Sequence, residues 1–310
     1  MESFAGKLAV VTGGGTGMGR ELVALLAAEG CSVAACDLNP DTLAATVEQA
    51  RRGAPVGVRV TGHRCDVADE EQVAGFRDEV VAAHGAGHIE LLFNNAGVAG
   101  GGSFVAGPRV AWDRTFAVNW GGVYNCARAF VPLLVASDEA VLVNVSSVNG
   151  FWASMGPGFP HTAYSTAKFA VKGFTEALIE DFRVNAPHVR VALVMPGHVG
   201  TDIALNARLV HGEMAAEEVE RLRAFMIATG TPAGEATDDA VRSTARAWAE
   251  SFRDDAPLTA AEAAAQILDG VRAGTWRILV GADAHALDAA VRADPVAVYT
   301  ADGPALLPPG

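Results

Sequence analysis

The feature that most constrains the fold is a regular alternation of short, β-branched apolar runs with longer helical patterns. Seven runs have the length and composition of buried strands, at residues 8–12, 32–37, 58–65, 89–94, 140–146, 189–195 and 276–280. Parallel strands need long crossover connections, which are usually helices, and the stretches between these runs can supply them. The sequence therefore predicts an α/β fold, with a seven-stranded parallel sheet flanked by helices on both faces.

Capping signals mark where two of the helices begin. Asn39 precedes Pro40, an order that suits a helix cap and the first helical position. Thr259 stands three residues before Glu262, the spacing of a capping box. The alanine-rich stretch 236–265 keeps a helical spacing of apolar residues, so we expect ordered helices there. We predict one domain over residues 1–298 and a tail over 299–310, which is rich in proline and glycine.

Composition and charge exclude several classes of partner. The 310 residues are 50% hydrophobic, which is enough to bury one large core. The formal net charge of −13 opposes binding to nucleic acid and to anionic membranes. No apolar run reaches the length of a membrane span and neither end resembles a signal peptide, so we expect a cytoplasmic protein. The four cysteines lack Cys-x-x-Cys spacing, so we expect buried thiols and no metal site.

The first predicted strand runs directly into a glycine-rich turn. Its glycines at 13, 17 and 19 have the spacing Gly-x-x-x-Gly-x-Gly, which differs from the Gly-x-Gly-x-x-Gly of two-domain dehydrogenases. An apolar helix follows at once, so backbone amides and a helix N-terminus converge where a pyrophosphate can bind. A glycine-rich turn alone is more often only a turn. Its position after the first strand, with an acid at the end of the second, favours a dinucleotide site.

That acid is Asp37, which lies 20 residues beyond Gly17. A carboxylate at this point can accept hydrogen bonds from both hydroxyls of an adenosine ribose, and it repels a 2′-phosphate. Neither Thr16 nor Leu38 supplies the cation that such a phosphate needs, so the sequence favours NAD over NADP. The alternative is that Asp37 only forms the turn before Asn39.

Tyr164 and Lys168 stand one helical turn apart and follow a serine pair, Ser146 and Ser147, at the end of a valine-rich strand. This spacing places a phenol and an ammonium group on one helix face. A nearby positive charge favours the phenolate and so helps to make a base. Taken alone, such a pair is usually only part of an amphipathic helix.

In their order and placement these motifs resemble the short-chain dehydrogenase/reductase family, over residues 6–281. The resemblance rests on the glycine turn at 12–19, Asp66, Asn94-Asn95-Ala96-Gly97, Asn119, Ser147, Tyr164 with Lys168, and Pro196-Gly197 followed by Thr201. It implies a Rossmann-type, doubly wound sheet. It also implies a homotetramer, a dimer of dimers in which helices near 109–136 and 162–185 pair across a two-fold axis.

The resemblance assigns a catalytic role to four residues. Tyr164 is similar to the family's general acid/base, and Lys168 to the residue that assists it and holds the nicotinamide ribose. Ser147 corresponds to the serine that bonds the substrate oxygen, and we choose it over Ser146 because it directly precedes the family's turn. Asn119 corresponds to an asparagine that steadies a water in a proton relay. The alternative for Asn119 is a hydrogen bond to a neighbouring carbonyl.

The same resemblance implies the residues that hold NAD. Asp66 is expected to accept from the adenine amino group, and Thr201 to bond a carboxamide or phosphate. The full set of expected cofactor-binding residues is Gly13, Thr16, Gly17, Met18, Gly19, Asp37, Leu38, Asp66, Val67, Asn95, Ala96, Gly97, Tyr164, Lys168, Pro196, Gly197, Val199 and Thr201.

Two segments depart from the family pattern. The loop at 148–163 is enlarged and aromatic, and we expect it to overhang the substrate, although core packing is the alternative for Phe151 and Trp152. Residues 202–257 form a long insertion with an apolar face, which we expect to be a substrate lid. The predicted substrate-pocket residues are Phe151, Trp152, His161, His198 and Leu205.

These expectations together predict an NAD-dependent short-chain alcohol dehydrogenase or ketone reductase. Its substrate is expected to be a small hydrophobic secondary alcohol or the matching ketone, because the loop and the lid are apolar. Two alternatives stay open. One is an epimerase or dehydratase that uses NAD on the same fold, and the other is a non-catalytic NAD-binding sensor.

Overall fold

The computed structural model describes residues 1–310 apart from 157–159, 229–230, 232–236, 301–302 and 305–310. Its centre is a seven-stranded sheet in the order β3-β2-β1-β4-β5-β6-β9. Every neighbouring pair is parallel, which confirms the predicted fold class. The strands are β1 Leu8–Thr12, β2 Ser32–Asp37, β3 Val60–Arg64, β4 Leu91–Asn94, β5 Ala140–Val145, β6 Val189–Pro196 and β9 Arg277–Val280.

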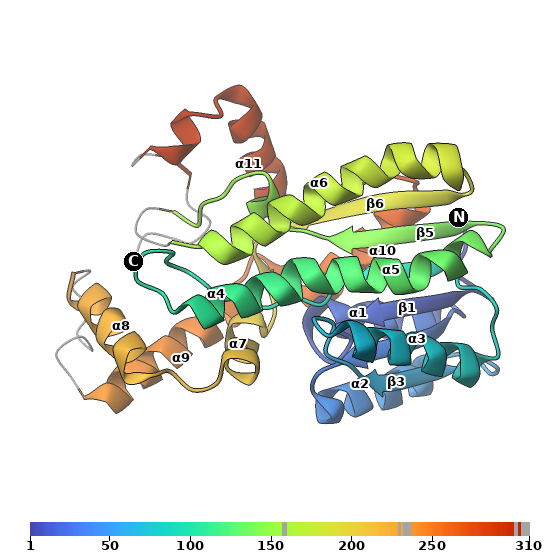
Figure 1. The fold of residues 1–310 in the computed structure, drawn as a ribbon, viewed down its shortest axis with the longest axis horizontal. Helices are drawn as coiled ribbons and strands as arrows, with labels where there is room; N and C mark the ends of the chain where they lie inside the picture. The colour runs from blue at the N-terminus through green and yellow to red at the C-terminus, as the bar shows by residue number, and fades with distance from the viewer. Residues whose placement is uncertain (157–159, 229–230, 232–236, 301–302, 305–310) are drawn as a thin grey trace.

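Helices cover both faces of this sheet (Figure 1). Buried side chains of α1 Gly17–Ala28, α2 Pro40–Gly53 and α10 Ala260–Arg272 form one core with the strands. Those of α3 Glu70–His84, α5 Gly122–Val135 and α6 Thr162–Asn185 form a second core on the opposite face. Val11 belongs to the first core and Val10 to the second, because successive strand residues point to opposite faces.

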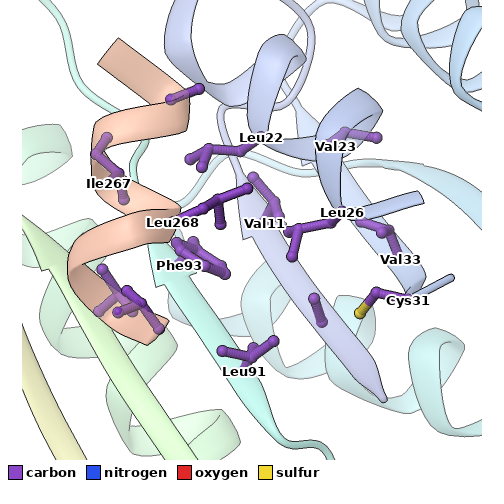
Figure 2. Packing of buried hydrophobic residues seen from close by; sticks show 14 of the residues in the cluster. Val11, Leu22, Val23, Leu26, Cys31, Val33, Leu91, Phe93, Ile267 and Leu268 are labelled. Carbon is purple, nitrogen blue, oxygen red and sulfur yellow. The ribbon is translucent and has the colours of Figure 1, made fainter. Parts of the chain in front are cut away.

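Figure 2 shows how the first core is assembled. Leu22 and Leu26 from α1 meet Ile267 and Leu268 from α10 over Val11 of β1. All five side chains are at most 2% exposed. This packing fixes the first helix, and therefore the glycine turn that precedes it, against the sheet.

Both predicted caps are present. The side chain of Asn39 accepts hydrogen bonds from the backbone amides of Asp41 and Thr42 at the start of α2. Thr259 and Glu262 form the reciprocal capping box of α10. The structure also has a small second sheet that was not predicted, in which β7 Val199–Gly200 pairs with β8 Leu258–Thr259. Two-residue strands are too short to carry a periodic signal.

The insertion at 202–257 contains three helices, α7 Ile203–His211, α8 Ala216–Ala228 and α9 Asp238–Asp254. They gather beyond one edge of the sheet, with α7 next to α4 Arg109–Phe116 (Figure 1). Part of the predicted apolar face is used within the insertion itself, where Val219, Met226 and Val241 form a small buried cluster. The first residue of the alanine-rich stretch lies outside the described part of the chain, and helices α9 and α10 confirm the rest of that prediction.

The long helix predicted near 109–136 is divided by a π-helical segment, Ala117–Gly121, between α4 and α5. Such segments are rare and often accompany functional sites. The chain continues after β9 through α11 Ala282–Ala293 to a short 3-10 turn, Ala297–Tyr299. The predicted boundary between domain and tail therefore falls inside this turn, and most of the predicted tail lies outside the described residues.

All four cysteines are buried free thiols, as predicted. Across the residues that the structure describes, no helix combines the length and the apolar character needed to cross a bilayer.

Candidate functional site

A cavity of about 640 Å³ lies at the carboxyl ends of the strands, where the sheet order reverses between β1 and β4. Open parallel sheets commonly bind ligands at such a point. Every residue predicted to hold the cofactor lines this cavity, except Gly19. Of the four predicted catalytic residues, Ser147, Tyr164 and Lys168 line it, and Asn119 lies behind its wall.

The glycine turn is clasped by the segment after β4. The hydroxyl oxygen of Thr12 accepts hydrogen bonds from the backbone amides of Asn95 and Ala96, each at 3.0 Å. The side-chain amide of Asn95 donates to the carbonyl of Thr12 at 2.9 Å. Gly13 has a φ of +67°, and a Cβ on Gly19 would lie 2.0 Å from the Gly13 carbonyl oxygen. Because Gly19 has no side chain, the Gly13 carbonyl can pack directly against it. Gly19 therefore faces the turn and does not line the cavity.

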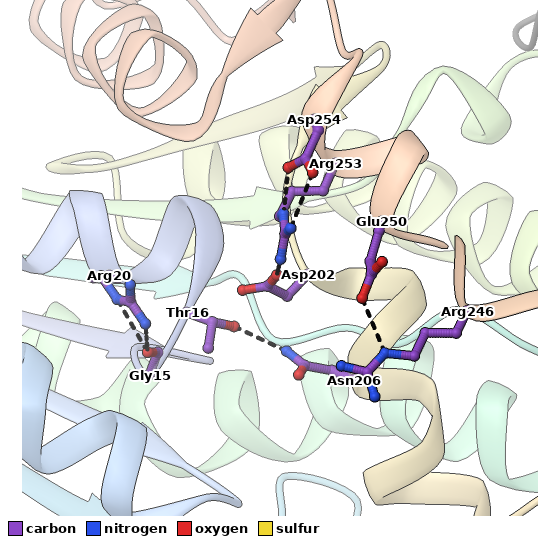
Figure 3. Close-up of polar contacts among 9 residues, drawn as sticks. All are labelled: Gly15, Thr16, Arg20, Asp202, Asn206, Arg246, Glu250, Arg253 and Asp254. Carbon is purple, nitrogen blue, oxygen red and sulfur yellow. Dashed lines mark hydrogen bonds and ion pairs between the residues drawn. The ribbon is translucent and has the colours of Figure 1, made fainter. Parts of the chain in front are cut away.

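Asp37 forms the turn that the alternative hypothesis described. One carboxylate oxygen accepts from the backbone amide of Gly15 at 2.9 Å, and the other from that of Asn39 at 3.0 Å. The carboxylate thus shapes the turn, and its remaining lone pairs can still accept from a ligand. On the outer side of the turn, Arg20 donates to the Gly15 carbonyl (Figure 3).

The structure places a cation here that sequence reasoning missed. Arg64 ends β3, pairs in register with Asp37 and lines the cavity. Arg64 is exposed, and its guanidinium makes no hydrogen bond or ion pair with any residue that the structure describes. Asp66 is different, because its carboxylate already accepts from Arg114 at 2.6 Å and from the Ala68 amide at 3.0 Å. Two arginines therefore lie near this end of the cavity, and only Arg114 is paired with a carboxylate among the described residues.

Tyr164, Ser147 and Lys168 converge at the other end of the cavity. Ser147 and Tyr164 both line this part of the cavity. Burial raises the pKa of Tyr164 to about 12, and the hydrogen bond to Ser147 acts in the opposite direction. The ammonium of Lys168 lies 5.4 Å from the centre of the Tyr164 ring and donates to the Val145 carbonyl at 3.0 Å.

Burial also lowers the pKa of Lys168 to about 8, since a buried ammonium loses its hydration. The predicted activation of the phenol by Lys168 is thus outweighed by burial in the protein alone. Both groups resist the charged form. A base at Tyr164 requires additional positive charge close to the phenol.

Ser146 and Ser147 make different contacts in the structure. The Ser146 hydroxyl donates to the Lys168 carbonyl at 2.8 Å, in a buried position that ties β5 to α6. The Ser147 oxygen faces Tyr164 and accepts from the Asn149 amide at 3.1 Å. Ser147 is therefore placed toward the reacting end of the cavity.

Asn119 lies in the π-helical segment and is fully buried. Its side-chain amide donates to the carbonyls of Val98 and Thr115, both at 2.9 Å. This is the carbonyl bonding that the alternative hypothesis anticipated. A Cβ on Gly97 would lie 2.8 Å from the Asn119 side-chain oxygen and 3.5 Å from the Lys168 ammonium. The absence of a side chain at Gly97 therefore allows Asn119 and Lys168 to approach the backbone there.

Helix α7 closes the cavity from the side of the insertion. Its residues Ile203, Asn206, Leu209 and Val210 follow a helical spacing and line the cavity. Leu205 lies off that stripe and does not line it, which corrects its assignment to the substrate pocket. Asn206 donates to the Thr16 hydroxyl at 3.1 Å, so the insertion is bonded directly to the glycine turn (Figure 3).

His198 also differs from its prediction, since it is a structural connector rather than part of the cavity wall. Its backbone amide donates to Asp283 at 2.6 Å, and its ring nitrogen lies 2.6 Å from the Phe252 carbonyl oxygen. Phe252, from α9, lines the cavity instead. Next to it, Arg253 bonds Asp202 at 3.1 Å and so ties α9 to the start of α7 (Figure 3).

The described residues of the aromatic loop pack against the protein and do not line the cavity. Trp152 is fully buried beside α11, and Phe151 packs against the same cluster, so their placement in the substrate pocket is wrong and the core alternative holds. The ring of His161 lies 4.6 Å from that of Tyr164, but His161 does not line the cavity. Burial lowers the pKa of His161 to about 4. Residues 157–159 of this loop lie outside the described residues.

Comparisons with known proteins agree with this geometry. A family model described as short chain dehydrogenase matches residues 7–210. SadH of Mycobacterium tuberculosis, designated an oxidoreductase by its name, is 35% identical over 293 residues, 94% of this chain and 92% of that protein.

Two solved structures are similar over different shares of the chain. A short chain dehydrogenase/reductase from Burkholderia phymatum in complex with NAD has a TM-score of 0.79 at 28% identity, covering 98% of this chain and 99% of that one. A metagenomic short-chain oxidoreductase in complex with NADP has a TM-score of 0.55 at 31% identity, covering 63% and 83%.

The burial of Lys168 predicts a pH-dependent stability. The pKa falls from 10.5 to about 8 on folding, so the unfolded state binds more protons between these values and the stability contribution of Lys168 rises with pH across this window. The unfolding free energy of the wild type minus that of Lys168→Met should therefore rise by about 3 kcal/mol from pH 7 to pH 10.5. Urea unfolding of both proteins measures it, and an equal difference at the two pH values would contradict the assigned burial.

Proposed function

The chain belongs to the short-chain dehydrogenase/reductase family, and from this premise we propose that it is an NAD-dependent enzyme that interconverts a hydrophobic secondary alcohol and its ketone. The observation that carries the proposal is the convergence of Tyr164, Ser147 and Lys168 on the cavity that also holds the glycine turn and Asp37. Lys168 lies one helical turn from Tyr164 at the same end.

The residues present fit a dinucleotide. The N-terminus of α1 and the glycine-rich turn before it suit a pyrophosphate. Asp37 suits the adenosine ribose, and Lys168 suits the second ribose beside Tyr164. When bound, the oxidised nicotinamide supplies the hydride acceptor and a positive charge.

The chemistry of the chain's own residues follows from burial. To oxidise an alcohol, Tyr164 must accept the hydroxyl proton while the carbinol carbon gives up a hydride, and reduction runs the same step backwards. In the protein alone burial holds the pKa of Tyr164 at about 12, so the phenol keeps its proton. Lys168, with a pKa of about 8, still carries positive charge at neutral pH. Together with a second cation nearby, this charge helps to lower the pKa of Tyr164. Ser147 holds the substrate oxygen against Tyr164.

The preference for NAD rests on Asp37. A 2′-phosphate beside this carboxylate would be repelled, and the carboxylate already bonds the turn that surrounds it. Arg64 moderates that repulsion, because it is a cation on the neighbouring strand whose guanidinium pairs with none of the described residues. Similar solved structures hold NAD in one case and NADP in another. The balance between Asp37 and Arg64 therefore decides the cofactor of this chain.

The preference for a hydrophobic substrate rests on the lid side of the cavity. Ile203, Leu209 and Val210 from α7 and Phe252 from α9 contribute apolar side chains there. A charged substrate would lose hydration against this wall without gaining a paired cation. An alcohol or ketone with an apolar body loses little hydration free energy there, and its binding removes apolar surface from water.

Removing the Tyr164 hydroxyl tests the assigned chemistry. Tyr164→Phe should lower kcat for alcohol oxidation by about a hundredfold or more, because general acid/base catalysis contributes about that much. NAD affinity, measured by calorimetry, should stay within a few-fold of the wild type. Tyr124→Phe, which removes the hydroxyl of an exposed tyrosine on α5, is the matched control. Retained turnover in Tyr164→Phe would refute the assignment.

Replacing Asp37 tests the cofactor assignment. Asp37→Ser should weaken NAD binding by about tenfold to a hundredfold, since hydrogen bonds to a charged group are lost. NADP binding should strengthen, and adding Arg64→Gln should reverse that gain while changing NAD binding little. Asp41→Ser, which removes an exposed carboxylate from the same helix region, controls for net charge. An unchanged ratio of NAD to NADP affinity in Asp37→Ser would contradict the assignment.

A further inference from the structure

The C-terminal 3-10 turn lies against the loop that carries Ser147, although about 150 residues separate them in the sequence. The indole N–H of Trp152 donates to the Val298 carbonyl at 3.1 Å. The backbone amide of Ala153 donates to the Tyr299 hydroxyl oxygen at 3.0 Å. In Figure 1 the C-terminal segment in red stands beside the yellow-green loop after β5.

Burial reinforces these two hydrogen bonds. Trp152 is 0% exposed and shares a cluster with Val148 at 0%, Leu287 of α11 at 7% and Val298 at 5%. Val148 immediately follows Ser147 in the chain. The cluster therefore reaches from the C-terminal turn to within one residue of the serine that bonds Tyr164.

The loop between these points is a single hydrogen-bonded unit. The Gly150 amide donates to the Ser147 carbonyl at 2.9 Å, and the Trp152 amide to the Val148 carbonyl at 2.9 Å. The side-chain amide of Asn149 donates to the carbonyl of Trp152 at 3.0 Å. Because each of these bonds joins a residue near Ser147 to one near Trp152, a displacement of Trp152 is transmitted to Ser147.

A second contact fixes the same loop from the sheet side. The Arg277 guanidinium lies 5.5 Å from the centre of the Phe151 ring, a cation–π distance. Both terminal nitrogens of Arg277 bond Asp288 of α11, at 2.6 Å and 3.0 Å. Helix α11 thus connects the loop to the C-terminal turn that follows it.

We propose that residues 296–300 act as a clamp that positions Ser147 for the reaction. The inference rests on the proposed function, because it assigns the clamp a role in alcohol oxidation. Trp152 and Tyr299 are positioning residues that act through the Ser147 loop and touch no substrate. This role is distinct from that of the lid, which closes the opposite side of the cavity.

The double variant Trp152→Phe/Tyr299→Phe tests the clamp. It keeps most of the aromatic packing and removes the indole donor and the hydroxyl acceptor. The paired control is Trp276→Phe/Tyr124→Phe, which makes the same two exchanges at residues that are each 45% exposed. Neither control side chain makes a hydrogen bond with a residue that the structure describes.

The test has a catalytic readout. In the double variant kcat for alcohol oxidation should fall by about tenfold, because two hydrogen bonds that hold the loop are lost. The NAD dissociation constant should stay unchanged, since neither residue lines the cavity. The half-maximal point of the kcat profile should move to higher pH, because the hydrogen bond from Ser147 lowers the pKa of Tyr164. A purely structural contact would lower thermal stability without this shift.

A second readout does not depend on turnover. Hydrogen–deuterium exchange of the backbone amides at 148–153 should accelerate in the double variant and not in the control. Unchanged exchange, or faster exchange with an unshifted pH profile, would overturn the inference. If the wild type oxidises no alcohol with NAD, the proposed function fails and the clamp's role in catalysis fails with it. Exchange alone then decides whether the clamp holds the loop.

Discussion

The parallel packing of β1, β4 and β5 is the constraint on which the rest of the structure depends. Because these strands run in the same direction, their carboxyl ends meet at one edge of the sheet. The loops that leave them therefore converge, and the glycine turn, the Asn95 segment and Ser147 become neighbours. The hydrogen bonds that the backbone amides after β4 donate to the Thr12 hydroxyl fix this arrangement locally. A cavity at this edge follows from the topology before any catalytic side chain is considered.

Burial at that edge sets the electrostatics of the site. Tyr164 and Lys168 share a poorly hydrated environment, which raises the pKa of the phenol and lowers that of the ammonium. The protein alone therefore holds the pair in a state of low charge and low reactivity. Ser147 is the neutral partner that opposes this effect on Tyr164, so its exact placement matters to the chemistry. This requirement gives the loop after β5, and whatever holds that loop, a direct link to function.

Much of this arrangement could be predicted because the signals are local. Strand runs, the caps at Asn39 and Thr259, and the Tyr164–Lys168 spacing each depend on residues close together in the sequence. The direction of Trp152 could not be predicted, because it is set by α11 and the C-terminal turn more than 130 residues away. The proximity of Arg64 to Asp37 required the register between two strands.

The rotational phase of a helix in the insertion was also hard to predict from its apolar residues. Leu205 was placed in the pocket because the insertion is apolar, but only the true phase of α7 shows that Ile203 and Leu209 face the cavity. The most direct test of the account is absorbance at the reduced-nicotinamide band during incubation with hydrophobic secondary alcohols and either NAD or NADP. Absorbance should rise with NAD when an alcohol is present, and should rise much less with NADP. Tight NAD binding without reduction by any alcohol of the panel would contradict it.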